Sequence, residues 1–193
     1  MTVDIANMIV HLARLAQNGG NTGLTAAQWT ALRFFARANR FSRTPSAFSE
    51  FHATTRGTAS QTVKSLVAMG LLRRLSNASD ARSTLIEVTD AGHAMLREDP
   101  LRDLNTVLSR LPPETRRILE EALNHATSEL AVLRDAPSFG NCTSCAHCKT
   151  RSGEAYCHCT QSILGQEDMA GVCIDFDLAT RAEPPRLNAR AVE

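Results

Sequence analysis

The sequence predicts a mainly α-helical protein with one small β-hairpin and a short cysteine-rich segment towards its C-terminal end. Apolar residues recur at helical spacing over most of residues 5–135. Two short segments rich in apolar residues, at 71–75 and 84–88, flank a polar stretch, as strands joined by a polar tip do. All six cysteines lie within residues 142–173. The 193 residues, 43% of them hydrophobic, suffice for one core of ordinary size and a small appendage.

The first two helices are predicted from periodicity and capping signals. Apolar residues repeat at helical spacing over 5–16, and Asn18-Gly19-Gly20 ends that run. A second helix starts at Thr25, because its hydroxyl and the side chain of Gln28 have the spacing of a capping box. An apolar stripe then follows on this helix, made of Trp29, Leu32 and Phe35 or Ala36.

The next two helices are separated by a short break. Thr44-Pro45 starts the third helix, with proline at a position where its missing N–H is not needed, and Phe48 and Phe51 are expected to face inward. The fourth runs from about 55 to 69, and Gly70 is a favourable C-terminal stop. Its inner face is expected to consist of Ala59, Val63, Leu66 and Val67.

The hairpin is followed by helices up to about residue 135. Thr89-Asp90 caps one helix, and Pro100 interrupts the pattern before apolar residues resume over 101–111. Pro112-Pro113-Glu114 opens the last long helix, which carries an apolar stripe to Leu133. We expect three regions: a helical domain at 1–135, a cysteine-rich segment at 136–180 and a loose tail at 181–193.

Charge is distributed unevenly along the chain. The net charge is only +1, but residues 37–82 hold eight basic and two acidic side chains, an excess that can attract phosphates. No stretch of about 18 apolar residues and no signal-peptide pattern occurs, so we expect a cytoplasmic protein without a membrane partner. No nucleophile elbow, phosphate loop or acid–base pair with a recognisable spacing is present, so an enzyme is not expected.

The predicted order of helix, helix, short turn, helix and hairpin is that of a winged helix-turn-helix, which places one helix in the major groove of duplex DNA. The exposed residues of that helix are donors and acceptors that can contact bases or phosphates. A polar solvent-facing surface is the alternative explanation for them. The candidate contacts are Thr55, Arg56, Thr58, Ser60, Gln61 and Lys64, together with Arg73 at the start of the hairpin.

Three short motifs, Gly70-Leu71, Asp80-Ala81-Arg82 and Thr89-Asp90-Ala91-Gly92, follow the predicted helix-turn-helix in this order. Their order and spacing resemble the MarR family of transcription regulators over about residues 4–135. The resemblance implies that Arg82 enters the minor groove while Asp80 orients it or the wing, and a narrow minor groove attracts arginine electrostatically. The family's usual second arginine beside the aspartate is missing here.

The resemblance also implies an assembly. Members of the family form twofold dimers through their terminal helices, and the first and last helices predicted here are long and apolar enough for that. A dimer presents two recognition helices about one DNA turn apart, which implies a pseudo-palindromic operator. Monomer core packing is the other explanation for the apolar stripes.

The cysteines have the pattern Cys-x2-Cys-x2-Cys-x8-Cys-x-Cys-x13-Cys. In a reducing compartment such clustering favours metal binding or redox chemistry over disulfides. Four thiolates can hold an iron–sulfur cluster or zinc, and metal-free thiol switching is a third possibility. Few large apolar residues surround them, so a metal centre would supply much of the local folding energy.

The spacing of four of these cysteines resembles that of small high-potential-type [4Fe–4S] modules. Those modules use one Cys-x2-Cys pair and two later, widely spaced cysteines, here matched by Cys142-x2-Cys145, Gly153-x3-Cys157 and Cys173-Ile174-Asp175-Phe176. The resemblance implies an iron–sulfur cluster of the [4Fe–4S] type, held by Cys142, Cys145, Cys157 and Cys173. Cys148 and Cys159 are substitutes or additional redox thiols.

These features together predict a DNA-binding repressor or activator whose metal centre senses redox state, oxygen, nitric oxide or iron. Loss of the cluster would unfold a segment attached directly to the last dimerisation helix, and so change the spacing of the recognition helices. The alternative is a regulator with a structural zinc site and a small-molecule effector. A redox or electron-transfer protein that carries a winged helix is a third class, but no substrate or flavin motif accompanies the cysteines.

Overall fold

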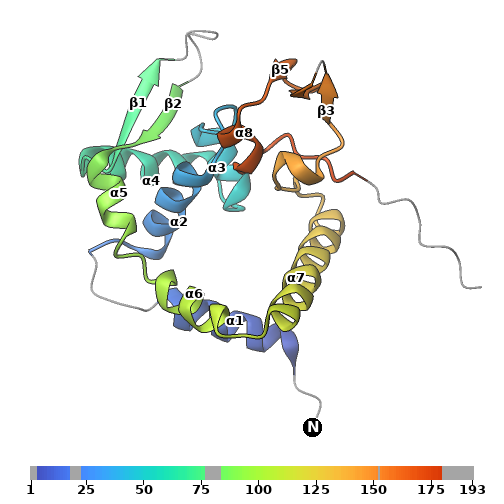
Figure 1. Cartoon of the computed structure of the whole chain (residues 1–193). Coiled ribbons are helices and arrows are strands. Elements are labelled where there is room, and N and C mark those ends of the chain that lie inside the picture. Colours follow the sequence, from blue (N-terminus) through green and yellow to red (C-terminus); the bar gives the residue numbers. More distant parts are fainter. Residues whose placement is uncertain (1–3, 18–22, 77–83, 152, 180–193) are drawn as a thin grey trace, which may run out of the picture.

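A computed structural model of the chain describes residues 4–17, 23–76, 84–151 and 153–179. Figure 1 shows a helical body with the α1 and α6 helices at one end, a head with a two-stranded hairpin at the other, and a small C-terminal part that α7 connects to the α1–α6 end. The termini of the described chain therefore lie on different parts of the molecule. Within the described ranges, none of the helices combines the length and apolarity required to cross a membrane.

The head, residues 24–96, is built from α2 (Ala26–Arg37), α3 (Pro45–Phe51), α4 (Arg56–Ala68), β1 (Leu72–Ser76), β2 (Thr84–Val88) and α5 (Asp90–Leu96). This is the predicted order of helices and hairpin. The two strands are antiparallel and pair Leu72 with Val88 and Ser76 with Thr84. The sheet therefore forms a wing beside the helix-turn-helix made by α3 and α4 (Figure 1).

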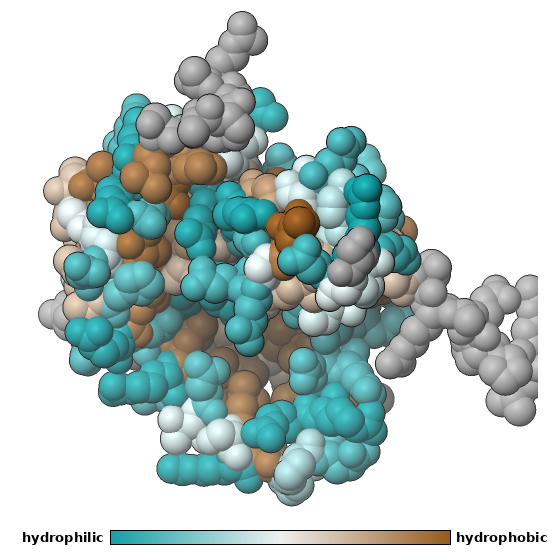
Figure 2. Space-filling view, turned by 45° about the horizontal axis from the view of Figure 1, so that its top comes forward, coloured by the Kyte–Doolittle hydropathy of each residue, from teal (hydrophilic) through white to brown (hydrophobic). Residues whose placement is uncertain are grey.

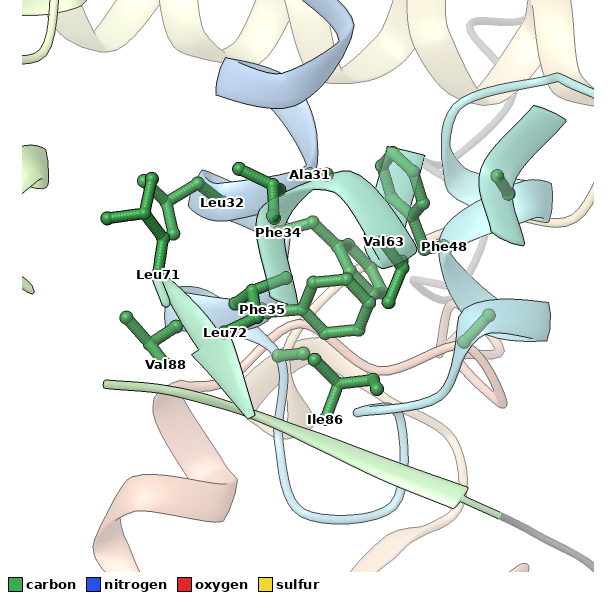
Figure 3. Packing of buried hydrophobic residues seen from close by; sticks show 14 of the residues in the cluster. Ala31, Leu32, Phe34, Phe35, Phe48, Val63, Leu71, Leu72, Ile86 and Val88 are labelled. Atoms are coloured by element: carbon green, nitrogen blue, oxygen red, sulfur yellow. The ribbon is translucent and has the colours of Figure 1, made fainter. Parts of the chain in front are cut away.

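Side chains from every layer of the head meet in one apolar core. Phe34 and Phe35 of α2 contact Phe48 of α3, with ring centroids 5.7 Å apart in both pairs. Figure 3 shows Val63 of α4 and Ile86 of the wing closing around the same rings. Aromatic residues of this size bury large apolar areas, so this core holds the recognition helix and the wing to one support.

Side-chain caps define the helix starts as the sequence predicts. Thr25 and Gln28 form the capping box of α2, with Gln28 N–H donating to Thr25 Oγ1 at 3.3 Å and Thr25 N–H to Gln28 Oε1 at 2.8 Å. Thr44, Thr55 and Thr89 cap α3, α4 and α5 in the same manner with their hydroxyls. Each cap satisfies a backbone N–H that the first helical turn leaves without a partner.

Three further helices carry apolar side chains that the single chain leaves exposed. These are α1 (Ile5–Gln17), α6 (Leu101–Ser109) and α7 (Pro113–Leu133), and none of them contains a buried residue. Helix α1 packs against α6 (Figure 1). The head is joined to this end by Arg33, whose guanidinium makes two hydrogen bonds of 2.7 Å to the Asp99 carboxylate just before α6. Figure 2 shows hydrophobic surface in the hollow between the head and these helices.

The cysteine module, residues 140–179, has secondary structure that the sequence did not predict. It contains a short 3₁₀ turn η1 (Cys142–Ser144), strands β3 (Cys148–Arg151), β4 (Glu154–Cys157) and β5 (Ser162–Ile163), and helix α8 (Gln166–Ala170). The strands form an antiparallel sheet in the order β3-β4-β5. Strands this short carry too few residues for a visible alternation of polar and apolar side chains, so the pattern could not be recognised.

One packing expectation for the head was wrong. Phe48 is fully buried as predicted, but Phe51 is 38% exposed. Phe51 lies at the end of α3 and contacts Phe34 on one side and Phe139 on the other, at centroid distances of 4.9 and 5.1 Å. Helical spacing placed Phe51 one turn from Phe48, but the short α3 ends there and leaves its last side chain at the edge of the core.

Candidate DNA-reading face and cysteine cluster

Helix α4 presents a polar face to solvent at the position of a recognition helix. Ala59, Val63 and Leu66 are buried against the head core, which turns the opposite face outward. The residues predicted to read DNA lie on that face: Thr55, Arg56, Thr58, Gln61 and Lys64 are exposed and Ser60 is half-buried. The apolar stripe of α4 therefore determines which side chains are available to a duplex.

Two of these candidates also have a local structural role. Thr55 Oγ1 accepts a hydrogen bond from Thr58 N–H at 3.2 Å and lies 2.9 Å from Thr58 Oγ1. Both hydroxyls therefore stabilise the first turn of α4, where they hold the N-terminal end in shape. Arg56, Gln61 and Lys64 have longer side chains that reach beyond this turn, so they are the stronger candidates for contacts to bases and phosphates.

The wing contributes basic side chains beside α4. Arg73 and Arg74 are exposed on β1, and Arg73 forms an ion pair with Glu87 directly opposite on β2. This pair engages Arg73 within the wing, so its guanidinium is less available to a phosphate than the sequence suggested. The predicted contacts Asp80 and Arg82 lie outside the described residues.

Hydrogen bonds hold the wing and α4 to the rest of the head. Gln28 Nε2 of α2 donates to Ser65 Oγ of α4 at 2.9 Å. Ile86 N–H of β2 donates at 2.7 Å to the carbonyl of Arg43, which lies in the α2–α3 loop, residues 38–44. Because the loop precedes α3 and also holds β2, its position affects both the helix-turn-helix and the wing.

The six cysteines fall into two classes of exposure. All six lie in the described part of the chain and none forms a disulfide. Cys148 is half-buried and Cys159 is exposed. The other four are buried, and they are the four predicted ligands Cys142, Cys145, Cys157 and Cys173. Three segments supply them: η1 begins at Cys142 and is followed directly by Cys145, β4 ends at Cys157, and Cys173 follows α8.

The buried thiols influence one another electrostatically. Burial is the main cause that raises the pKa of Cys142 to about 12, and the neighbouring thiols of Cys173, Cys148, Cys145 and Cys157 contribute to the rise as negative charges would. Burial also raises the pKa of Cys173, against hydrogen bonds from Asn39 and Ser42 that lower it. Without a cation these two thiols stay protonated at neutral pH, whereas a bound metal would favour the thiolates.

Polar groups around the thiols suit sulfur ligands. Thr160 N–H points at Cys157 Sγ over 3.5 Å. Among the described residues, Thr160 Oγ1 is the buried side-chain oxygen that has no hydrogen-bond partner. Cys142 Sγ donates to the carbonyl of Asp168 at 3.6 Å. Hydrogen bonds to sulfur are one means by which proteins adjust iron–sulfur centres.

The thiols do not converge on the geometry of a single ion. In the described ranges, no three Cys, His, Asp or Glu side chains are arranged to hold one metal ion. A tetrahedral zinc site with Zn–S distances of about 2.3 Å requires sulfur atoms roughly 3.8 Å apart.

The cysteine module packs directly on the α2–α3 loop. Val172 forms a parallel bridge with Ala38, in which Val172 N–H donates to the Arg37 carbonyl at 2.8 Å and Asn39 N–H donates to the Val172 carbonyl at 3.0 Å. Ile174 N–H donates to Ser42 Oγ at 3.0 Å. Sequence reasoning missed these contacts, because backbone pairing of residues more than 100 positions apart has no local pattern.

The arrangement of α2, α3, α4 and the wing defines a winged helix-turn-helix. The MarR family model matches residues 22–83, which include the helix-turn-helix and stop before the cysteines. Among proteins with curated functions, none matches the sequence.

Solved structures of several regulators share the fold. A MarR transcriptional regulator from Methanosarcina mazei Go1 superposes with a TM-score of 0.56 and 19% identity, covering 67% of this chain and 97% of that one. The regulator BldR from Sulfolobus solfataricus has a TM-score of 0.51 and 25% identity, covering 65% of this chain and 93% of that one. A point mutant of MepR from S. aureus has a TM-score of 0.52 and 20% identity, covering 67% of this chain and 98% of that one.

Over residues 22–83 the chain is similar to the MarR family, and solved MarR-type regulators share its winged helix-turn-helix fold. Proteins of this family are DNA-binding regulators, not enzymes. The structural matches leave about a third of this chain uncovered, and the family model includes none of the six cysteines.

Proposed function

We propose that this MarR-type regulator binds duplex DNA as a homodimer and that a metal centre in its cysteine module controls its DNA affinity. The centre is an iron–sulfur cluster of the [4Fe–4S] type held by Cys142, Cys145, Cys157 and Cys173. One observation carries the proposal: the four cysteines are buried together in a module with almost no other core. Redox state, oxygen, nitric oxide and iron supply are the candidate signals.

The composition of the module's interior supports a stabilising metal. Its buried cluster consists of Cys142, Cys157 and Leu164, with only partly buried residues around it. Three residues bury too little apolar area to order about 40 residues against their conformational entropy. Thiolate–metal bonds contribute folding free energy where a site forms only in the folded state, which makes a metal the natural source of stability here.

The spacing of the cysteines along the chain favours a [4Fe–4S] cluster over a single zinc ion, because one Cys-x2-Cys pair and two later, widely spaced cysteines resemble small [4Fe–4S] modules. The N–H of Thr160 approaches Cys157 Sγ at 3.5 Å, and hydrogen bonds of this kind to sulfur ligands are one means by which proteins adjust iron–sulfur centres. A constitutive zinc site, with a small-molecule effector as the signal, is the second candidate.

Exposed side chains of α4 contact the DNA, together with residues of the wing. Arg56 and Gln61 contact base edges, Lys64 contacts phosphates, and Arg82 with Asp80 acts in the wing. Helices α1 and α7 supply the dimer interface, because their apolar side chains are exposed in the single chain. These include Ile5, Met8, Ile9, Leu12, Leu15, Ile118, Leu123 and Leu130. A twofold dimer then reads a pseudo-palindromic operator.

Anaerobic purification followed by absorbance and metal analysis tests the centre. An iron–sulfur protein is brown, absorbs broadly near about 400 nm and contains iron and sulfide, whereas a zinc protein is colourless. Operator fragments selected from a random duplex library then give DNA affinities by gel shift for the metal-loaded and chelator-treated protein. Equal affinities in the two states contradict the sensor function, and absence of any bound metal contradicts the centre itself.

A further inference from the structure

The module and the head are interlocked by apolar side chains as well as by backbone pairing. Val172 and Ile174 of the module pack against the head core. In the other direction, Phe41 of the α2–α3 loop packs against the module's buried cluster. Each part therefore contributes side chains to the other's interior. In the module these residues are the two neighbours of Cys173, and in the loop Phe41 is the neighbour of Ser42.

The fourth proposed ligand lies at the centre of this contact. Cys173 is buried, and Asn39 and Ser42 of the loop hydrogen-bond to its side chain. Its neighbours bond to the same region: Val172 exchanges backbone hydrogen bonds with Arg37 and Asn39, and Ile174 N–H donates to the Ser42 hydroxyl. Asn39 in turn shapes the loop, because its Oδ1 accepts from Ser42 N–H at 3.0 Å and Phe41 N–H at 3.1 Å. A change at Cys173 thus reaches the loop through direct contacts.

Charged and aromatic contacts extend the same interface. Arg40 of the loop donates to the Ile163 carbonyl at 2.7 Å and lies 3.6 Å from Asp168, a buried carboxylate at α8. Phe139, just before the module, contacts Phe51 at the end of α3. The module and the residue before it therefore contact the head both at the α2–α3 loop and at the end of α3.

The contact closes the chain into a ring. The head connects to α6 through α5 and the Arg33–Asp99 pair, α6 leads to α7, and the module returns from the end of α7 to the head (Figure 1). A closed ring restricts the orientation of the head relative to α7 more than a single connection does, because the segment from α6 through α7 to the module is held to the head at both of its ends. Opening the return contact leaves α7 joined to the head by way of the α1–α6 end.

Building on the proposed function, we infer that the metal centre regulates DNA binding through the α2–α3 loop, with Val172–Cys173–Ile174 as the element that transmits its state. When the centre is loaded, Cys173 is held as a ligand and the flanking residues pair with the loop. When the metal is lost, this segment loses its anchor, the loop loses its partners, and α3, α4 and β2 are no longer held in one arrangement. A mechanism in which the module acts through its covalent connection to α7 would not need these contacts with the loop.

Gly171 offers a variant that separates the two parts with little change to either. Its φ of −75° is accessible to any residue, so alanine causes no backbone strain. The added Cβ, however, would lie 2.8 Å from Asn39 N and Cα. Gly165→Ala is the matched control in the same module, because its Cβ would meet only Asp168 Oδ2, at an ordinary 3.7 Å.

The experiment measures the ratio of operator affinities of anaerobically prepared, metal-loaded protein and chelator-treated protein. In the wild type and in Gly165→Ala we expect this ratio to be about 5- to 150-fold, the usual range of coupling between two sites. In Gly171→Ala with a wild-type metal content, the ratio should fall to less than about twofold. Ser42→Ala, which removes the acceptor for Ile174 N–H, should reduce the ratio in the same direction and serves if Gly171→Ala does not fold.

Hydrogen–deuterium exchange of the wild type provides a readout that needs no DNA. The N–H groups of Asn39, Val172 and Ile174 make hydrogen bonds between the head and the module, so metal removal should accelerate their exchange. The amide of Val63 in α4, within the head core, should change far less. Unchanged exchange at the three interface amides after metal removal overturns the inference.

The outcomes distinguish this inference from the function on which it rests. If metal removal changes the operator affinity of the wild type and of Gly171→Ala by the same factor, transmission through the loop is contradicted, but the sensor function is not. A wild type that takes up metal but binds DNA equally in both states contradicts the sensor function, and with it the transmission. A wild-type ratio in the expected range, together with a collapsed ratio in Gly171→Ala and accelerated exchange at the interface, supports both.

Discussion

The head and the cysteine module differ in what fills their interiors. The head is closed by aromatic and aliphatic side chains from four helices and two strands, centred on Phe34, Phe35 and Phe48. The module's buried cluster contains two cysteines and one leucine. A core of the first kind is stable through apolar burial alone, whereas one of the second kind depends on bonds to its thiols. Removal of a buried thiol should therefore abolish metal binding by the module and leave the head folded. Removal of an apolar side chain from the head core should instead lower the free energy of unfolding of the head.

The largest effect is expected from Cys157→Ser. Cys157 is buried at the end of β4, and a hydroxyl is a poor substitute for a soft thiolate ligand, so metal incorporation should be lost completely. The neighbouring variant Cys159→Ser is the control, since that side chain is exposed and should not be needed. Iron, zinc and sulfide analysis of both proteins checks this, with circular dichroism to show that the helices persist. Full metal content in Cys157→Ser would remove this cysteine from the ligand set.

Phe48→Ala should have the second largest effect, and on the head alone. Phe48 is fully buried, and truncation of such a side chain lowers the free energy of unfolding by about 3–5 kcal/mol. Denaturant unfolding followed by the fluorescence of Trp29, the single tryptophan and part of the head core, measures it. Phe51→Ala, at a half-exposed position, should cost clearly less. Leu164→Ala should leave the Trp29 transition near that of the wild type and instead weaken metal retention. A Leu164→Ala shift as large as that of Phe48→Ala would show that the two cores unfold as one.

A moderate effect is expected at the exposed face of α4, without loss of stability. Arg56→Ala and Gln61→Ala should each reduce discrimination between operator and altered sites by about 1–3 kcal/mol, the range for one bidentate base contact. Lys64→Ala should weaken binding to all sequences and reduce the slope of log affinity against log salt by about 1. Arg116→Ala, an exposed arginine on α7, is the control. Wild-type specificity in both Arg56→Ala and Gln61→Ala would indicate that this face is only a solvated surface.

The smallest effect concerns a helix cap in the head. Thr25→Ala removes the hydroxyl of the capping box of α2 and should lower the free energy of unfolding by about 0.5–2 kcal/mol. Thr30→Ala is the control, because its hydroxyl bonds back to the Ala26 carbonyl inside the same helix and is not required there. The Trp29 transition reports both. A Thr25→Ala change no larger than that of Thr30→Ala would mean that the cap adds nothing to the packing of α2.

The order of elements in the head was predictable, because it depends on local chemistry. Helical spacing, threonine caps at Thr25, Thr44, Thr55 and Thr89, and two short strands are properties of neighbouring residues. The inward position of Ala59, Val63 and Leu66 follows from the same spacing. The position of Phe51 did not, because it depends on where α3 stops.

The candidate site was predictable only in its residue types. Clustered cysteines indicate thiol chemistry, and the spacing singled out the four that are buried in the structure. Neither the strands around them nor the ion pair of Arg73 with Glu87 could be recognised beforehand. Strand pairing and ion pairing depend on which residues face one another after folding, and for short strands the sequence has no periodic signal of this.

The sequence by itself determined a winged helix-turn-helix with a polar recognition face and a separate group of thiols, because helix periodicity, caps and residue chemistry are local properties. Only the tertiary structure decided that the thiol group packs on the α2–α3 loop. That contact joins Val172 and Ile174 to residues of the head more than 100 positions away, through backbone hydrogen bonds and the complementary fit of Gly171 against Asn39. Backbone groups are the same in every residue, so no sequence pattern specifies which of them will pair across such a distance.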